Sequence, residues 1–282
     1  MSRIAYVNGQ YVPHRQASVH VEDRGYQFAD GVYEVIAVRD GQLVDMPPHF
    51  DRLERSLGEL EIEAPMSRQA LTFILKEVIR RNRVRNGIVY LQITRGVAPR
   101  DHQFPTDPNA AVVVTARNAI PKVAQRAAGI GVISTEDIRW KRCDIKSVSL
   151  LPNVLAKQKA VEAGAYEAWQ IDENGNVTEG SATNAWIVTK NGEIVTRNTD
   201  EAILSGVTRL AVLELAKRDG IPLVERPFTL EEAKEAKEAF LTSTTSNVMP
   251  VIEIDGTPVG NGHPGTVTRA LSELYEQLAI GG

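Results

Sequence analysis

The 282-residue sequence predicts a mixed α/β protein with two lobes, an N-terminal α+β lobe and a second lobe of α/β type. Asn8-Gly9 and Asp40-Gly41 each stand between two β-rich segments, which is the pattern of a tight hairpin. Apolar residues recur with helical spacing between positions 50 and 79. Residues 117–129 contain Pro121 and show neither the helical spacing of apolar residues nor the alternation of a strand. They are therefore predicted to separate the lobes.

The N-terminal lobe is assigned to residues 1–118. After the two hairpins, a first helix carries apolar side chains on one face at Phe50, Leu53, Leu57 and Leu60. A second helix begins near Ser67, which is a suitable N-cap, and continues the apolar stripe to Ile79. The segments IVYLQITR and AAVVVTA then read as strands.

Residues 119–128 are the predicted linker and residues 129–282 the second lobe. Its first strand, IGVIST, precedes the basic loop RWKRCDIKS and a helix that runs from about Pro152 to Gly164. Strands, a hairpin and a helix ended by Gly220 follow, and Thr229 with Glu232 forms a capping box for the next helix. The last helix has its apolar residues at Val267, Leu271, Leu274 and Leu278.

Composition and charge narrow the functional classes. A net charge of −4 gives no general attraction to nucleic acid or to an anionic membrane surface. No apolar run approaches the roughly 20 residues that span a bilayer, and the N-terminus lacks the apolar core of a signal peptide. A single cysteine fits a reducing compartment, and five scattered histidines form no metal motif. We therefore expect a cytoplasmic protein without a metal site, a membrane anchor or a nucleic-acid partner.

Lys146 ends the basic stretch RWKRCDIK. A lysine alone is usually a solvated surface residue, and this cluster also suits a phosphate-binding patch. A lysine becomes a nucleophile toward a carbonyl when it loses its proton, and Arg139 and Arg142 are close enough in sequence to lower the pKa of Lys146.

Three other segments carry polar groups whose chemistry the residues alone leave open. Glu179 in VTEGSATN is either a turn acid or the partner of a buried cationic nitrogen. The helix start at Gly206–Thr208 is either a simple N-cap or an anion site, and Ser243, Thr244 and Thr245 add hydroxyl donors at a strand end. Arg100 and His102 stand two apart in a loop, and the pair suits a carboxylate if it is not simply solvent-exposed.

Taken together, ordered motifs along nearly the whole chain resemble the fold-type IV aminotransferases, which use pyridoxal 5′-phosphate, and most closely their D-amino-acid aminotransferases. The motifs are EDRGYQFADGVYEV, HFDRL, ITRGVAPRDHQFP, EDIRWKRCDIKS, LLPNVLAKQ, VTEGSATN, LSGVTR and TSTTS. The resemblance implies a smaller N-terminal α+β domain and a larger C-terminal cofactor-binding domain with a β-barrel-like sheet and flanking helices.

The resemblance also implies roles for individual residues. Lys146 would hold the cofactor as a Schiff base and move the proton at the substrate Cα, and Glu179 would keep the pyridine nitrogen protonated. The remaining cofactor contacts would come from Arg52, Leu204, Val207, Thr208, Ser243 and Thr244. The substrate α-carboxylate would be bound by Tyr33, Arg100 and His102.

The implied reaction transfers the amino group of a D-amino acid, such as D-alanine or D-glutamate, to a 2-oxo acid such as 2-oxoglutarate. The implied assembly is a homodimer with a shared active site, to which Arg100 and His102 would come from the partner subunit. Two positions depart from the family pattern. Asp101 places an acid inside the carboxylate-binding pair, and Ala182 stands where a hydroxyl often occurs.

Two kinds of alternative remain. Another fold-type IV enzyme would keep the cofactor and change the chemistry: an aminodeoxychorismate lyase, an (R)-amine transaminase or a branched-chain L-amino-acid transaminase. The Arg100 and His102 pair argues against the amine option, because an amine substrate has no carboxylate. A non-catalytic module that binds anions through the basic loop is the alternative of another class.

Overall fold

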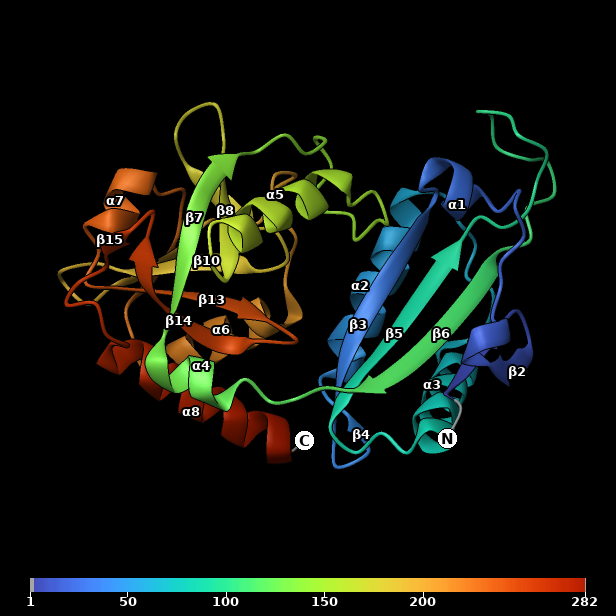
Figure 1. Ribbon diagram of the computed structural model, residues 1–282, viewed down its shortest axis with the longest axis horizontal. Helices are drawn as coiled ribbons and strands as arrows, with labels where there is room; N and C mark the ends of the chain where they lie inside the picture. The colour runs from blue at the N-terminus through green and yellow to red at the C-terminus, as the bar shows by residue number, and fades with distance from the viewer. Residues whose placement is uncertain (1–2, 282) are drawn as a thin grey trace. The chain divides into compact units, whose positions relative to one another are not determined.

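The computed structural model describes residues 3–281, with side chains as far as residue 279. The chain divides into two compact units. Unit 1 is Met1–Pro121 with Ile145–Ser149, and unit 2 is Lys122–Asp144 with Leu150–Gly282 (Figure 1). Within residues 3–281, no helix has the length and apolar character needed to cross a membrane.

Unit 1 is built on a six-stranded antiparallel sheet with the order β2-β1-β6-β5-β3-β4. The strands are β1 (Ile4–Val7), β2 (Gln10–Pro13), β3 (Gly31–Arg39), β4 (Gln42–Leu43), β5 (Gly87–Thr94) and β6 (Ala111–Asn118). Both predicted hairpins are confirmed. Asn8-Gly9 and Asp40-Gly41 each have two positive φ angles, 44° and 93° in the first pair and 46° and 82° in the second, as the tightest hairpin turns require.

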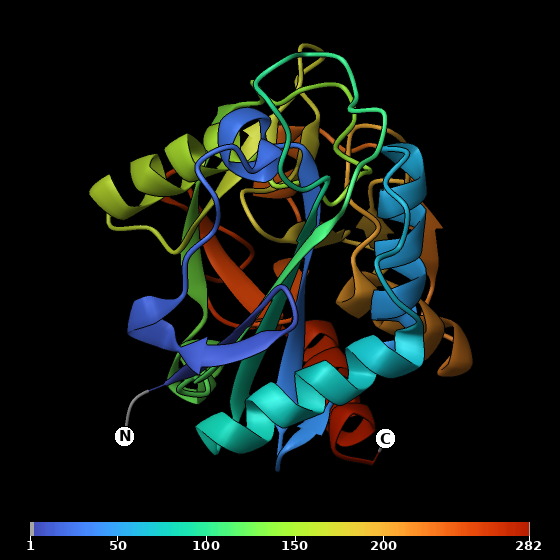
Figure 2. The ribbon, with the colours of Figure 1, turned by 90° about the vertical axis from the view of Figure 1, so that its right-hand side faces the viewer.

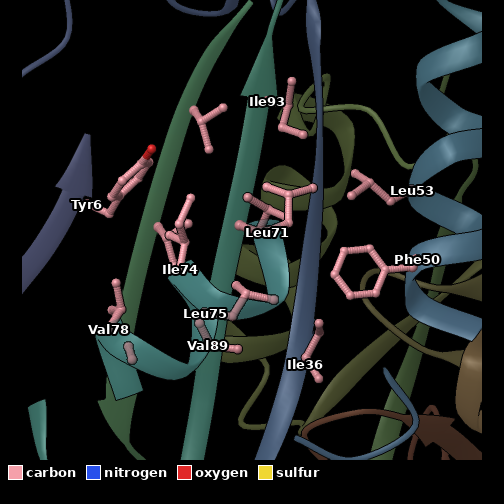
Figure 3. Packing of buried hydrophobic residues seen from close by; sticks show 14 of the residues in the cluster. Tyr6, Ile36, Phe50, Leu53, Leu71, Ile74, Leu75, Val78, Val89 and Ile93 are labelled. Carbon is pink, nitrogen blue, oxygen red and sulfur yellow. The ribbon is translucent and has the colours of Figure 1, made fainter. Parts of the chain in front are cut away.

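Two helices, α2 (Met46–Glu59) and α3 (Arg68–Asn82), cover one face of this sheet (Figure 2). The core between them includes Phe50 and Leu53 of α2, Leu75 of α3, and Ile36 and Val89 of the sheet (Figure 3). Each of these fully buried side chains contributes roughly 2 kcal/mol of hydrophobic stabilisation. The predicted cap is also confirmed, because the Ser67 hydroxyl accepts a hydrogen bond from the Ala70 amide at 3.3 Å. Two short helical segments, η1 (His14–Gln16) and α1 (Arg24–Phe28), complete unit 1.

Unit 2 contains a mixed nine-stranded sheet that curls into a half-barrel, with the order β12-β11-β10-β13-β14-β7-β8-β9 and β15 beside β14. The strands are β7 (Ile130–Glu136), β8 (Glu167–Ile171), β9 (Val177–Gly180), β10 (Asn184–Val188), β11 (Ile194–Thr196), β12 (Leu223–Glu225), β13 (Glu238–Ser243), β14 (Asn247–Ile254) and β15 (Thr257–Pro258). Its helices are α4 (Val123–Ala128), α5 (Leu151–Glu162), α6 (Val207–Arg218), α7 (Leu230–Lys234) and α8 (Thr266–Gly281). The flanking helices and the barrel-like sheet thus match the predicted fold class.

Three details differ from the sequence-based expectation. The segment 119–128, predicted as a linker, contains helix α4. Residues 145–149, predicted within the second lobe, group with unit 1. The last helix buries Thr268, Leu271 and Tyr275, whereas Leu278 is 43% exposed. The predicted face, with Leu274 and Leu278, and the buried face, with Thr268 and Tyr275, both have helical spacing. The spacing alone therefore could not show which face is buried.

Candidate active site

Lys146 lies in the segment 145–149, which adds to the edge of β3. The Tyr33 amide donates to the Lys146 carbonyl at 3.0 Å, and Ser147 forms an antiparallel bridge with Val32. The Lys146 amide donates to the Ser56 hydroxyl at 3.2 Å, and the preceding Ile145 is buried in the core of unit 1. The main chain at Lys146 is therefore fixed from two sides, and its ammonium group lies 4.3 Å from the centroid of the Tyr33 ring.

The rings of Tyr33 and Tyr90 lie side by side on β3 and β5. Their centroids are 5.8 Å apart, and the Tyr90 hydroxyl donates to Gln92 at 2.7 Å. Burial, and secondarily Tyr33, raise the pKa of Tyr90 to about 12. Tyr90 therefore stays a neutral hydrogen-bond donor. No sequence pattern singled out Tyr90, because an aromatic residue in a strand is ordinary.

Arg100 and His102 come together at the ring of Phe28. The Arg100 guanidinium lies 5.0 Å from the ring centroid, and the His102 ring lies 5.5 Å from it. Both side chains are exposed, and they contact the same ring, as their two-residue spacing predicts. The structure thus places this pair against Phe28, and it places Tyr33 beside Lys146.

Arg52 of α2 is bound to a buried carboxylate. Its Nε and Nη2 donate to the two oxygens of Glu34 at 2.8 and 2.7 Å, and His49 Nδ1 lies 2.7 Å from Glu34 Oε2. Burial raises the pKa of Glu34, but the charge of Arg52 and the hydrogen bonds from Arg52 and His49 outweigh burial and lower it to about 2. Glu34 is therefore ionised at neutral pH. The sequence alone assigns no role to Glu34 or His49, although they belong to the motifs that contain Tyr33 and Arg52.

The pKa of His49 is lowered, chiefly by burial, and the charges of Arg52 and Lys146 act in the same direction against the opposing effect of Glu34. The His49 ring is therefore neutral at neutral pH. Since Glu34 is a carboxylate that can only accept, the Nδ1 atom of His49 carries the proton and donates to it.

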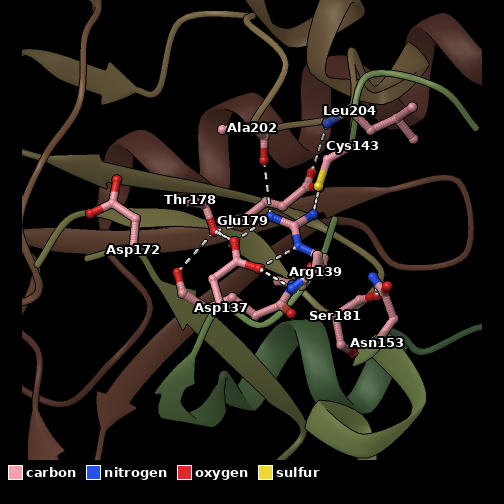
Figure 4. Close-up of polar contacts among 12 residues, drawn as sticks. Asp137, Arg139, Cys143, Asn153, Asp172, Thr178, Glu179, Ser181, Ala202 and Leu204 are labelled. Carbon is pink, nitrogen blue, oxygen red and sulfur yellow. Dashed lines mark hydrogen bonds and ion pairs between the residues drawn. The ribbon is translucent and has the colours of Figure 1, made fainter. Parts of the chain in front are cut away.

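Glu179 of β9 is buried, and three donors hold its carboxylate, one of which is Arg139 (Figure 4). Arg139 Nη1 donates to Oε1, while Asn184 Nδ2 and the Leu204 amide donate to Oε2 at 3.0 and 3.2 Å. Asn184 is therefore a candidate site residue without a predicted role, and the contact of Arg139 with Glu179 was not predicted. The structure pairs Arg139 with two acids, Glu179 and Asp137. This pairing does not support the hypothesis that the charge of Arg139 lowers the pKa of Lys146.

The helix α6 begins beside the residues that hold Glu179. Gly206 is its N-cap and, having no side chain, makes no side-chain cap hydrogen bond to the first amides of α6. Thr208 is buried, with its hydroxyl 3.5 Å from the Tyr275 hydroxyl. A helix start of this kind favours an anion, as the sequence suggested.

Ser243 and Thr244 lie at the end of β13, in the turn that leads to β14. The Ser243 hydroxyl accepts from the Ser246 amide at 3.1 Å and lies 3.5 Å from the Thr245 hydroxyl. Small hydroxyl donors therefore gather in this turn of unit 2. Over residues 3–281, no group of three or more His, Cys, Asp or Glu side chains is arranged to hold a metal ion.

Comparisons with known proteins identify the family of the chain. A family model described as "Amino-transferase class IV" matches residues 31–254. The D-alanine aminotransferase of Staphylococcus epidermidis is 41% identical over 273 residues, which are 96% of each chain. The D-alanine aminotransferase of Listeria monocytogenes serotype 4b is 42% identical over 97% of this chain and 95% of its own.

Among solved structures, a branched-chain amino acid aminotransferase complexed with N-(5′-phosphopyridoxyl)-L-glutamate, from the organism abbreviated T.th., superposes with a TM-score of 0.91. It is 29% identical, and the match covers 100% of this chain and 95% of that one. The fold-type IV architecture predicted from the motifs is confirmed. The protein belongs to the class IV aminotransferase family.

Proposed function

We propose that the protein is a pyridoxal 5′-phosphate-dependent aminotransferase that moves the amino group of a D-amino acid, such as D-alanine or D-glutamate, to a 2-oxo acid such as 2-oxoglutarate. The observation that carries this proposal is the near-full-length identity of 41% and 42% to two D-alanine aminotransferases. The single cysteine of the sequence suits the reducing conditions of the cytoplasm, where we expect the enzyme to act.

The side chains present fit this cofactor. Lys146 supplies an amine, Glu179 a buried carboxylate for a ring nitrogen, and Leu204 an apolar side chain for the ring face. The phosphate would be bound by the start of α6 at Val207 and Thr208, by Ser243 and Thr244, and by Arg52. The start of α6 supports this assignment, because its N-cap Gly206 makes no side-chain hydrogen bond to the first amides of the helix.

When bound, the cofactor supplies the carbonyl that receives the amino group and the ring that withdraws electrons from the substrate Cα. Lys146 would bind the carbonyl carbon and then move the proton at Cα. Glu179 would hold the proton on the ring nitrogen. Tyr33, Arg100 and His102 would bind the α-carboxylate, and this orientation would decide which hydrogen at Cα faces Lys146.

The direct test is an assay with D-alanine and 2-oxoglutarate, with L-alanine in parallel. We expect pyruvate and glutamate from D-alanine. The purified protein should be yellow, and borohydride should remove its visible band. Lys146→Ala should lack the borohydride-sensitive band while keeping the wild-type circular dichroism spectrum. Absence of pyruvate would overturn the D-amino-acid assignment, and a colourless protein after incubation with the cofactor would support a non-catalytic module instead.

A homodimer with a shared active site is part of the proposal, and subunit mixing tests it. Lys146→Ala and Arg100→Ala should each be inactive. If Arg100 acts in the partner's site, one of the two sites of each mixed dimer is intact, so refolding an equal mixture should restore about a quarter of the wild-type activity. If Arg100 acts within its own subunit, the mixture stays inactive.

A second candidate is a branched-chain L-amino-acid aminotransferase, favoured by the structural match to the T.th. branched-chain enzyme at a TM-score of 0.91. Both candidates need the same cofactor residues, and they differ in the hand of the substrate. L-Leucine with 2-oxoglutarate is therefore the deciding comparison. A kcat/KM for L-leucine above that for D-alanine would favour this candidate.

A further inference from the structure

Arg139 is the central residue of a buried ion cluster in unit 2. Only 4% of its side chain is exposed, and its guanidinium contacts two carboxylates at once. Nε and Nη2 donate to the two oxygens of Asp137 at 2.9 and 2.7 Å, while Nη1 donates to Glu179. Nη2 also donates to the Thr178 hydroxyl at 3.1 Å and to the Ala202 carbonyl at 2.9 Å (Figure 4). These contacts leave the guanidinium one orientation.

The charge of this cluster is fixed. Burial disfavours the guanidinium cation, but the negative charges of Glu179 and Asp137 outweigh burial and raise the pKa of Arg139. Arg139 is thus a permanent cation. Asp137 is also ionised, since the hydrogen bonds and charge of Arg139 outweigh burial and lower its pKa. One cation between two carboxylates gives the cluster a net charge of −1, which suits a single positive charge on a bound ligand.

The position of Arg139 decides where a shared proton resides. A pyridine nitrogen that meets Glu179 shares one proton with it, and the proton can rest on the nitrogen or on the carboxylate. A cation in contact with Glu179 Oε1 disfavours protonation of that carboxylate. With Arg139 in place the proton is held by the nitrogen, and a protonated ring withdraws electrons more strongly.

We propose that Arg139, oriented by Asp137, is a positioning residue that keeps Glu179 ionised and so places the shared proton on the ring nitrogen of the cofactor. This inference rests on the proposed function and deepens it. Arg139 acts through Glu179 and does not itself touch the ring nitrogen. The sequence pattern Asp-x-Arg, two residues apart at the end of β7, is the local feature that makes the pair.

The test replaces the ion pair by a neutral pair in the holoenzyme. Asp137→Asn with Arg139→Met removes one negative and one positive charge, so the net charge of the cluster stays the same. The control is Asp144→Asn with Arg142→Met in the same loop, because Arg142 Nε pairs with Asp144 at 3.0 Å and Arg142 is 35% exposed. Both double variants replace one Asp by Asn and one Arg by Met. Only the variant at Asp137 and Arg139 removes the guanidinium that contacts Glu179.

The readout is the 15N chemical shift of the cofactor ring nitrogen in holoenzyme loaded with 15N-labelled pyridoxal phosphate. Wild type, the control pair and Arg139→Lys should show a protonated nitrogen. In the Asp137→Asn/Arg139→Met variant the 15N shift should move toward the unprotonated value. The kcat should fall about tenfold or more for each unit by which the pKa of the ring nitrogen falls. Glu179→Gln gives the reference for a nitrogen without its carboxylate.

Each outcome separates this inference from the function it rests on. A wild-type protein without bound cofactor contradicts the proposed function. A variant that binds the cofactor and keeps the protonated 15N shift overturns the role of Arg139 alone. If the double variant does not fold, the deciding measurement is the side-chain 13C shift of Glu179 in wild-type holoenzyme. Its signal is assigned by its loss in Glu179→Gln. The shift of an ionised carboxylate supports the inference, and the shift of a protonated carboxyl overturns it.

Discussion

Arg24 holds the loop that carries Arg100 and His102. Its Nη1 donates to the Asp101 carbonyl at 2.7 Å and its Nη2 to the His102 carbonyl at 3.4 Å, across 77 and 78 residues of sequence. Arg24 is itself buried and bound to Asp30 at 2.8 Å. The exposed pair therefore stands on a main chain fixed from α1. Asp101, which departs from the family pattern, contributes its main-chain carbonyl to this contact, and a carbonyl is present whatever the side chain.

We predict that Arg24→Lys loosens this loop, because an ammonium cannot reproduce the fork that reaches two carbonyls and Asp30. Hydrogen exchange of amides 99–104 should accelerate, and KM for D-alanine should rise about tenfold with a smaller change in kcat. Arg85→Lys is the control, since Arg85 forms an exposed pair with Asp40. Unchanged exchange in this loop would contradict the role of Arg24.

Glu34 should make the stability of the protein depend on pH in the acid range. Its pKa of about 2 in the folded protein lies below the ordinary 4.5, so its contribution is complete above pH 4.5 and is lost as the pH falls toward 2. A shift of this size corresponds to about 3 kcal/mol.

Glu34→Gln should therefore be less stable than wild type at pH 7 by about 3 kcal/mol, and the difference should shrink between pH 4.5 and 2. Urea unfolding at several pH values measures it, with the exposed Glu63→Gln as control. A difference that does not change with pH would show that Glu34 is not the titrating group. Cofactor affinity should also fall, because Arg52 loses the carboxylate that orients it.

Gly206 has an ordinary helical-start backbone, φ −69°, yet it has no room for a side chain. A Cβ there would collide with the amide oxygen of Asn184, whose nitrogen donates to Glu179. Gly206→Ala should displace Asn184, cost about 1–3 kcal/mol and weaken cofactor binding. Gly58→Ala is the control, since a Cβ at this exposed helical position meets nothing within 4 Å and should be neutral or stabilising. Equal cofactor affinity in both variants would refute the steric argument.

Tyr33→Phe should separate substrate binding from cofactor binding. The phenyl ring remains beside the Lys146 side chain, so the visible cofactor band should not change. Loss of the hydroxyl should raise KM for D-alanine about tenfold, which is the effect of removing one hydrogen bond to a charged group. Tyr26→Phe, at a ring 75% exposed, should leave both quantities unchanged. A change in the cofactor band of Tyr33→Phe would instead assign Tyr33 to the cofactor.

The sequence by itself determined the features whose causes lie within a few residues. The positive φ angles at Asn8-Gly9 and Asp40-Gly41 are local preferences of those residue pairs, and the caps at Ser67 and Thr229 join groups three residues apart. The family also followed from sequence, because its motifs are short strings in a fixed order. Each of these features is encoded by residues adjacent in the chain.

Only the tertiary structure decided how charged groups distant in sequence pair. Arg139 meets Glu179 across 40 residues, and Arg52 meets Glu34 across 18. No local period encodes such contacts, because they form when β-strands and loops distant in sequence are brought together by burial of their apolar neighbours. The same reason explains Lys146, whose segment leaves unit 2 to bond along β3 of unit 1. The residue types of the site were readable in sequence, and their partners were set by the fold.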